Sequence, residues 1–256
     1  MIEKLFDLSG KVALITGGSR GIGRAIAGGF AEAGADLFLC ARKEETLQEA
    51  AGQIAGQTGR RVEWLVADMA VRGEADRVAR EALSRFGQVD ILINNAGWNI
   101  PQAIDEIRDQ DWDYLLELNL TSVMALTRAL VPQMKQRRWG RIVHISSIMG
   151  LASTPKRNAY SATKAALIGM AQASALELGP FNITVNCIAP GPIATEMPMS
   201  LLSKEQQDAL ASRTALGRWA EPEELVGPAL LLASEAGRYI TGTCLVVDGG
   251  ALARIF

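Results

Sequence analysis

Short apolar runs alternate with segments of helical periodicity along most of the chain. The runs predict strands that are buried on both faces, because apolar residues fill consecutive positions instead of every second one. The predicted strands are Lys11–Thr16, Asp36–Ala41, Arg61–Ala67, Val89–Asn94, Arg141–Ser146, Ile183–Ile188 and Cys244–Val247.

Between these runs, apolar residues recur at intervals of three and four, as on one face of an α-helix. The predicted helices are Gly21–Ala33, Glu44–Gln57, Arg72–Phe86, Asp111–Arg137, Ala159–Leu178 and Glu223–Ala233. Strands that alternate with helices predict a parallel sheet with helices on both faces. Neither a linker nor an internal repeat interrupts the pattern, so we predict a single α/β domain of the doubly wound, Rossmann type over residues 1–256.

The composition narrows the classes of partner. A net charge of −2, with one short basic block at 135–138, argues against a nucleic-acid partner. The scattered cysteines, Cys40, Cys187 and Cys244, predict reduced thiols in a cytoplasmic protein and no disulfide framework. A single histidine, His144, and the lack of a Cys-x-x-Cys motif predict that there is no metal site. Without a signal-peptide pattern or an apolar run of about 18 residues, we expect no membrane partner.

A glycine-rich turn follows the first predicted strand. Gly17, Gly21 and Gly23 have the spacing Gly-x-x-x-Gly-x-Gly and stand directly before a predicted helix. Missing side chains there let the backbone approach a pyrophosphate that rests on the helix N-terminus. Glycines also serve plain turns, but the position between a strand and a helix favours a dinucleotide site.

The end of the second predicted strand indicates which dinucleotide. Folds that bind NAD usually carry an acid there, about twenty residues after the glycines, to hold the ribose 2′-hydroxyl. This chain has Cys40–Lys43 at that point, and Asp36 lies at the wrong end of the strand. Arg42 and Arg20 can clamp a 2′-phosphate, and the alternative is two surface arginines. We predict NADP(H) as the cofactor in preference to NAD(H).

Tyr160 and Lys164 are four residues apart and therefore share one face of a predicted helix. A lysine cation about 4 Å from a phenol favours the phenolate by up to roughly 4 kcal/mol, which lowers the pKa of the tyrosine toward neutrality. A general acid or base works best when its pKa is near the operating pH. Ser147 follows the fifth strand and offers a hydroxyl to a substrate oxygen. The alternative is a chance pair on a solvated face.

Polar residues also follow the third and fourth strands. Asp68 ends the third strand, where its carboxylate can accept a hydrogen bond from an adenine amino group. The quartet Asn94–Gly97 is either a simple turn or a tight backbone passage beside the cofactor. Asn119 lies inside the longest predicted helix, where asparagine has poor propensity. Such a misfit indicates a functional or strained position.

Together these features resemble the short-chain dehydrogenase/reductase family, and the resemblance covers nearly the whole chain. The motifs that carry it are Thr16-Gly-x-x-x-Gly-x-Gly23, Asn94-Asn-Ala-Gly97, Asn119, Ser147, Tyr160-x-x-x-Lys164 and Pro190-Gly191. Each motif alone is weak, whereas their joint occurrence is specific. The resemblance implies an oxidoreductase that interconverts a ketone and a secondary alcohol by hydride transfer.

The resemblance also implies a role for each site residue. Tyr160 donates or accepts the proton, and Ser147 orients the carbonyl. Lys164 lowers the pKa of Tyr160 and binds the nicotinamide ribose. Asn119 holds a water that links Lys164 to solvent. The expected cofactor contacts are Gly17, Ser19, Arg20, Gly21, Ile22, Gly23, Arg42, Asp68, Asn95, Ala96, Gly97, Tyr160, Lys164, Pro190, Gly191, Ile193 and Thr195.

Two further expectations concern a mobile segment and assembly. Residues 196–213 are predicted to form a mobile substrate lid, whose Met197 and Met199 belong either to its own core or to the substrate wall. Family members often pair two long helices into a four-helix bundle, so we expect a homotetramer through helices 111–137 and 159–178. The apolar residues that support this are Met124, Leu167, Met170 and Leu176, and the alternative is that all of them belong to the intrachain core.

The substrate is expected to be a small ketone or keto-sugar. Neighbours in the family are 3-oxoacyl-carrier-protein reductases and sugar or polyol dehydrogenases such as gluconate 5-dehydrogenases. The carrier-protein enzymes tend to have two basic docking positions near the active-site mouth; Arg138 matches one, and Phe181 occupies the other. A 3-oxoacyl-carrier-protein reductase is the alternative, with an acyl carrier protein as a less favoured partner. A nucleotide-binding regulator without turnover is the alternative of another class. The expected pocket residues are Trp98, Asn99, Ile148 and Met149.

Overall fold

The apolar runs of the sequence form one parallel sheet in the computed structural model, which describes residues 1–196, 199 and 202–253. Its strand order is β3-β2-β1-β4-β5-β6-β7, the order of a doubly wound fold. The strands are β1 (Val12–Thr16), β2 (Asp36–Ala41), β3 (Val62–Val66), β4 (Ile91–Asn94), β5 (Gly140–Ile145), β6 (Ile183–Pro190) and β7 (Cys244–Val247). The predicted fold class is therefore confirmed.

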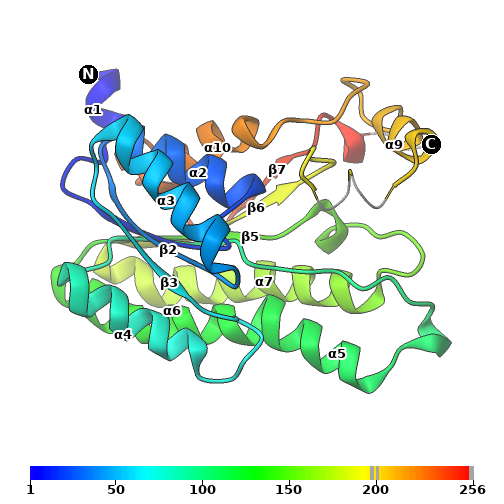
Figure 1. Ribbon diagram of the computed structural model, residues 1–256, viewed down its shortest axis with the longest axis horizontal. Coiled ribbons are helices and arrows are strands. Elements are labelled where there is room, and N and C mark those ends of the chain that lie inside the picture. The colour runs from blue at the N-terminus through cyan, green and yellow to red at the C-terminus, as the bar shows by residue number, and fades with distance from the viewer. Residues whose placement is uncertain (197–198, 200–201, 254–256) are drawn as a thin grey trace.

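Helices cover both faces of the sheet (Figure 1). One face carries α2 (Gly21–Glu32), α3 (Glu44–Thr58) and α10 (Val226–Ala233). The other carries α4 (Glu74–Phe86), α6 (Ser122–Arg137) and α7 (Asn158–Leu178). Successive residues of β1 enter different cores, since Leu14 belongs to the cluster under α4, α6 and α7 and Ile15 to the cluster under α2 and α3. Burial on both faces explains why the strands are continuous apolar runs.

The longest predicted helix, 111–137, is divided in the structure. It consists of α5 (Asp109–Leu116), a π-helical turn (Glu117–Thr121) and α6. The turn contains Asn119, the residue whose helix propensity is poor. A π turn inserted between α-helical segments is rare and occurs often at functional sites. The predicted long helix is present as one continuous helical stretch, Asp109–Arg137, and the π turn within it falls at the position where Asn119 was expected to be special.

Smaller elements complete the chain. A short α1 (Ile2–Phe6) precedes the sheet, and α9 (Lys204–Ala211) lies within the predicted lid. The last predicted helix, Glu223–Ala233, begins instead as a 3₁₀ turn over Pro222–Leu225, which leads into α10.

One helical stretch, Asp109–Arg137, is long and apolar enough to cross a membrane by length and composition alone. Its most apolar window has a mean hydropathy of 1.2, and half of that window is buried inside the molecule. Because α6 packs on α4 and β5 in the core, the stretch has the environment of a core helix, and it is weak evidence for a membrane span.

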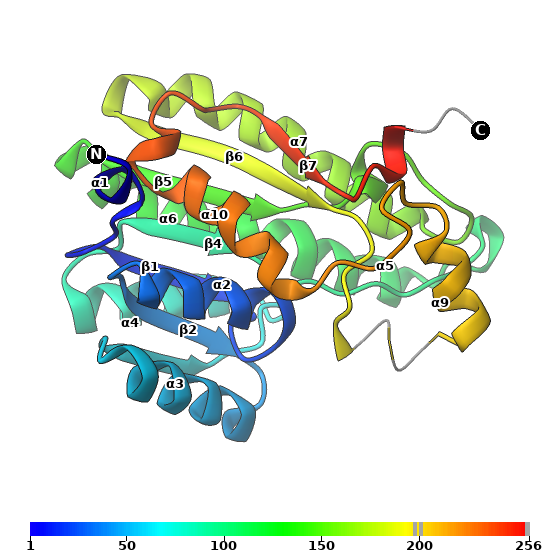
Figure 2. The ribbon, with the colours of Figure 1, turned by 90° about the horizontal axis from the view of Figure 1, so that it is seen from above.

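All strands run in the same direction, so their carboxyl ends meet at one edge of the sheet. Figure 2 shows this edge on the side of α9, with the N-terminus at the opposite side. The loops that follow the strands are brought together there. In open α/β sheets, ligands bind at this edge, near the point where the strand order reverses.

Candidate active site

The glycine-rich turn connects β1 to α2 through a backbone that only glycine tolerates at two points. Gly17 has a φ of +66°, in the left-handed region. A Cβ on Gly23 would stand 2.3 Å from the carbonyl oxygen of Gly17, so α2 packs directly against the turn. Gly21 opens α2, whose N-terminus therefore faces the edge of the sheet. This is the geometry that the sequence predicted for a pyrophosphate site.

Thr16 ties this turn to the loop after β4. Its Oγ1 accepts hydrogen bonds from the backbone amides of Asn95 and Ala96, both at 2.9 Å. The Asn95 side-chain amide donates back to the carbonyl oxygens of Thr16 and Gly17, at 2.9 and 3.2 Å. The predicted cofactor residues Asn95, Ala96 and Gly97 are thus held beside the glycine turn. In the sequence Thr16 was recognised only as the first residue of the glycine motif, and its role in holding the loop after β4 was missed.

Asn119 fixes the loop beyond Gly97 from within the π turn. Its side chain accepts a hydrogen bond from the amide of Trp98 and donates to the carbonyl of Trp98, both at 2.9 Å. It also donates to Thr163 Oγ1 at 3.2 Å. Because Asn119 is fully buried, these bonds form away from water and determine the path of the loop.

Ser147, Tyr160 and Lys164 meet at the carboxyl end of β5. Ser147 is the second residue after the strand, and its Oγ accepts a hydrogen bond from the amide of Met149 at 3.1 Å. Tyr160 and Lys164 lie in the first turns of α7, as the spacing predicted. The Lys164 Nζ donates to the carbonyl oxygen of Ile145 at 2.8 Å and stands 5.6 Å from the centroid of the Tyr160 ring.

Burial dominates the ionisation of both side chains. It lowers the pKa of Lys164 from 10.5 to about 8, although the nearby Cys187 acts in the opposite direction. Burial likewise raises the pKa of Tyr160 above its ordinary value, against a hydrogen bond with Ser147 and the charge of Arg157, which both lower it. The predicted fall of the Tyr160 pKa under the influence of Lys164 is therefore wrong for this structure, because burial outweighs the attraction to nearby charge. Tyr160 carries its proton at neutral pH.

Groups adjacent to this trio hold it in place. The Ser146 hydroxyl donates to the carbonyl oxygen of Lys164 at 2.8 Å, which joins β5 to α7. The Thr163 hydroxyl donates to the carbonyl oxygen of Tyr160 at 2.8 Å and accepts from Asn119. Sequence reasoning missed both residues, although each stands next to a predicted catalytic residue and carries a hydroxyl.

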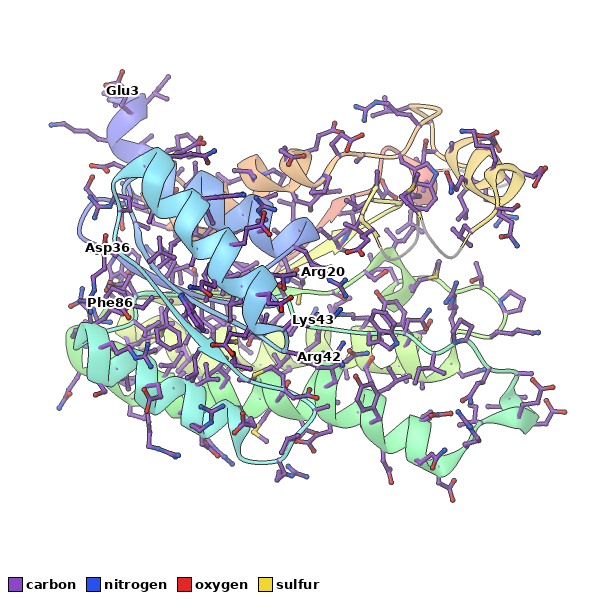
Figure 3. The ribbon with its side chains drawn as sticks, in the orientation of Figure 1. Glu3, Arg20, Asp36, Arg42, Lys43 and Phe86 are labelled. Atoms are coloured by element: carbon purple, nitrogen blue, oxygen red, sulfur yellow. The ribbon has the colours of Figure 1, made fainter. Side chains whose placement is uncertain are left out.

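The predicted cationic positions lie at the same edge. Figure 3 shows Arg20, Arg42 and Lys43 close to one another and Asp36 on the opposite side of the molecule. Arg42 and Lys43 directly follow β2, which begins at Asp36, and Arg20 lies in the glycine turn. Asp36 pairs there with Arg60 at 2.8 Å, far from a cofactor ribose. Arg20 donates to Glu196 at 2.9 Å, and Arg42 donates to the Tyr114 hydroxyl at 3.3 Å. The two positions directly after β2 carry Arg42 and Lys43 instead of an acid, and these donors fit a 2′-phosphate.

The loop after β6 closes the edge. The amide of Gly191 donates to the carbonyl oxygen of Val247 at 2.9 Å, and a Cβ on Gly191 would stand 2.7 Å from the Cα of Asp248. Ile193 is buried and forms a β-bridge with Ala220. Thr195 packs its methyl group against the glycine turn. The remaining predicted contacts lie at this edge too: Ser19 and Ile22 follow β1, Asp68 follows β3, and Pro190 is the last residue of β6.

A family model described as Enoyl-(Acyl carrier protein) reductase matches residues 17–251. The chain belongs to the short-chain dehydrogenase/reductase family. The predicted family and the prediction of an oxidoreductase are thereby confirmed.

Members of the short-chain dehydrogenase/reductase family that are similar to this chain are named for different activities. The chain is 39% identical over 243 residues to a 3-oxoacyl-acyl-carrier-protein reductase of Chlamydia trachomatis, covering 95% of this chain and 98% of that one. It is 38% identical over 259 residues to a 2-dehydro-3-deoxy-D-gluconate 5-dehydrogenase of Dickeya dadantii, covering 99% and 100%. The crystal structure of L-sorbose reductase from Gluconobacter frateurii, in complex with NADPH and L-sorbose, matches with a TM-score of 0.93 at 37% identity, covering 98% and 100%.

Some predicted positions of this short-chain dehydrogenase/reductase lie elsewhere. Arg138 precedes β5 and Phe181 precedes β6, so both lie at the amino ends of strands whose carboxyl ends carry the site. Within one chain they are not at the active-site mouth, which corrects the expectation that they are docking positions beside the mouth.

Of the two lid methionines, Met197 falls outside the described residues, whereas Met199 is exposed. Across the described ranges, no group of three or more His, Cys, Asp or Glu side chains is arranged for a metal ion.

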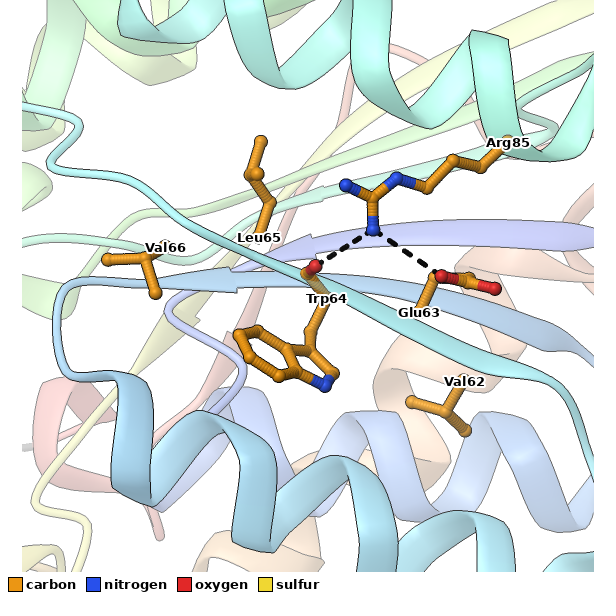
Figure 4. A pocket seen from close by; sticks show the side chains of 6 residues that line it. All are labelled: Val62, Glu63, Trp64, Leu65, Val66 and Arg85. Atoms are coloured by element: carbon orange, nitrogen blue, oxygen red, sulfur yellow. Dashed lines mark hydrogen bonds and ion pairs between the residues drawn. The ribbon is translucent and has the colours of Figure 1, made fainter.

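A groove of about 530 Å³ along the edge strand β3 is separate from this site (Figure 4). Arg85 crosses it, donating to the carbonyl oxygen of Trp64 at 3.2 Å and to Glu63 at 3.4 Å. Arg77 covers the next outward carbonyl, that of Val66, at 2.7 Å. The arginines occupy acceptors that an approaching strand would need, so the groove is a protected sheet edge.

Proposed function

We propose that this oxidoreductase uses NADP(H) to interconvert a small ketone and the corresponding secondary alcohol. The observation that carries the proposal is the convergence of Ser147, Tyr160 and Lys164 at the sheet edge that also carries the glycine turn. Bound NADP(H) supplies or accepts the hydride. Spectrophotometric NADPH oxidation across a panel of ketones tests the proposal, and binding without turnover on every member of the panel would favour a nucleotide-binding regulator.

The side chains divide the remaining work. In the reductive direction the Tyr160 hydroxyl gives its proton to the carbonyl oxygen, since Tyr160 carries that proton at neutral pH. The Ser147 hydroxyl donates a hydrogen bond to the same oxygen and orients it. Lys164 holds the nicotinamide ribose, and Asn119 fixes the neighbouring loop and a water that connects Lys164 to solvent. In the oxidative direction Tyr160 receives the proton instead.

Arg20 and Arg42 are proposed to select NADP(H) over NAD(H). Arg42 directly follows β2, at a position with no acid for a 2′-hydroxyl, and Arg20 lies in the glycine turn after the neighbouring strand β1. The sorbose reductase relative binds NADPH. A charge-assisted hydrogen bond contributes roughly 1.5–3 kcal/mol. Replacing both arginines with glutamine should weaken NADPH binding by at least tenfold and leave NADH binding nearly unchanged. A wild-type protein that binds NADH more tightly would contradict the assignment.

A small free ketone or keto-sugar is the proposed substrate. Of the two basic docking positions, Phe181 is apolar, and the Arg138 guanidinium already donates to the carbonyl oxygen of Pro180 at 2.9 Å. Asn99 Oδ1 is buried with no partner among the described residues, so it can accept a hydrogen bond from a sugar hydroxyl. Comparing kcat/KM for acetoacetyl-carrier protein with that for small ketones and keto-sugars tests this. A carrier-protein value higher by about two orders of magnitude would reverse the ranking.

A cytoplasmic homotetramer is the proposed assembly. The structure divides the candidate contact residues: Leu167 is buried, whereas Leu176 is 83% exposed and Met124 is 37% exposed. The exposed pair lies on α7 and α6, so these helices retain apolar surface for a partner. Light scattering should give four times the 27.4 kDa chain mass. Leu176→Glu should shift the population to smaller species, and a monomeric wild type at micromolar concentration would refute the assembly.

A further inference from the structure

An ion pair joins the glycine turn to the loop after β6. Arg20 Nη1 donates to Glu196 Oε2 at 2.9 Å, across 176 residues of sequence. Within residues 1–196, 199 and 202–253, neither side chain forms another ion pair. Among the described residues, Glu196 is therefore the only acid that pairs with Arg20, and Glu196 belongs to no cofactor motif.

The two loops are packed together at this point. A Cβ on Gly21, the residue after Arg20, would stand 3.1 Å from the methyl group of Thr195, the residue before Glu196. The backbones on both sides of the ion pair are thereby held close to each other. The pair is set by tertiary structure even though its side chains are 49% and 71% exposed.

We propose that Glu196 tunes cofactor preference by competing with the ribose 2′-phosphate of NADP(H) for Arg20. The proposal rests on the assignment of Arg20 as a 2′-phosphate ligand. A phosphate that binds Arg20 must displace the Glu196 carboxylate or stay beside it, and like charges repel. NAD(H) has no 2′-phosphate, so neither effect acts on it. Glu196 therefore reduces the preference for NADP(H) over NAD(H) without contacting the reacting atoms.

The second arginine has a different partner. Arg42 Nη1 donates at 3.3 Å to the hydroxyl of Tyr114, which is neutral and adds no competing negative charge. The attraction for a 2′-phosphate is consequently left intact at Arg42 and reduced at Arg20. This asymmetry makes Glu196 the position at which one substitution sharpens the preference.

The test is a set of fluorescence titrations with NADPH and with NADH on the full-length chain. Glu196→Gln should raise the ratio of Kd for NADH to Kd for NADPH by roughly two- to fivefold, the range of an exposed ion pair. Glu196→Asp, which keeps the charge, should stay near the wild-type ratio. Asp208→Asn is the matched control, since it removes an acid from an exposed pair with Lys204, also at 2.9 Å. The rise should disappear in an Arg20→Gln background.

An unchanged ratio in Glu196→Gln would overturn the proposal, and so would an equal rise in Asp208→Asn or in the Arg20→Gln background. These results leave the assigned cofactor intact as long as wild type prefers NADPH. A wild type that prefers NADH, with no response to replacement of Arg20 and Arg42, would overturn the proposed cofactor as well. Higher ionic strength should shrink the effect of Glu196→Gln, because screening weakens both attraction and repulsion.

Discussion

The only histidine of the chain should make stability fall between pH 7 and pH 5. His144 is fully buried, and its Nδ1 lies 3.0 Å from the side-chain amide nitrogen of Asn94. An amide nitrogen can only donate, so Nδ1 must accept and the ring must be neutral. Burial, followed by the charge of Lys164, lowers the pKa of His144 from 6.5 to about 3.

The sign and size of the effect follow from this pKa. The unfolded chain binds a proton at His144 below about pH 6.5 and the folded chain does not, so stability is lost as the pH falls. Between pH 7 and pH 5 the loss from this residue is about 2 kcal/mol. Well below pH 3, where the folded protein also binds the proton, the full difference of about 3.5 pKa units amounts to roughly 5 kcal/mol.

Urea unfolding of wild type and His144→Asn, at one protein concentration and at pH 7 and 5, isolates the effect. Any packing change in the variant is the same at both pH values, and the carboxylates titrate alike in both proteins. The loss of unfolding free energy from pH 7 to pH 5 in wild type, minus the same loss in the variant, therefore reports His144 alone. We expect wild type to lose about 2 kcal/mol more than the variant. Equal losses would refute the reasoning, as would an imidazole proton resonance of the folded protein that titrates near pH 6.5.

Two further predictions concern the glycine turn. Thr16→Val removes the acceptor for the amides of Asn95 and Ala96, so the free energy of unfolding should fall by roughly 2–4 kcal/mol in denaturant melts. Thr16→Ser keeps the acceptor, and its free energy of unfolding should fall by only about 1 kcal/mol. Gly23→Ala should reduce NADPH affinity at least tenfold in titrations because its Cβ meets a carbonyl oxygen at 2.3 Å; the control Gly28→Ala, with nothing within 4 Å, should bind normally.

The sequence predicted the sheet well because its strands are buried on both faces. Continuous apolar runs leave little freedom in assigning β1 or β6, and the parallel direction then places every following loop at one edge. The candidate residues at that edge could be named from motif and strand position. Boundaries shifted by a residue or two, as at β5, which begins at Gly140 instead of Arg141.

Features that depend on tertiary structure were missed. The π turn at Glu117–Thr121 interrupts a helix without interrupting its apolar spacing, so periodicity could not show it. The Tyr-Lys spacing does not reveal burial: Lys164 donates to the Ile145 carbonyl, and burial determines the direction of the Tyr160 pKa. The Arg20–Glu196 pair spans 176 residues, beyond the reach of any local pattern.

The central claim is that Tyr160 transfers the proton, and Tyr160→Phe tests it most directly. The substitution removes one hydroxyl and leaves the ring, so NADPH affinity measured by titration should stay within about threefold of wild type. Turnover on the best ketone of the panel should fall by a factor on the order of 10² to 10⁴. Tyr239→Phe, at a fully exposed tyrosine, should keep wild-type turnover. A folded Tyr160→Phe protein that reduces the ketone at a near-wild-type rate would contradict the account.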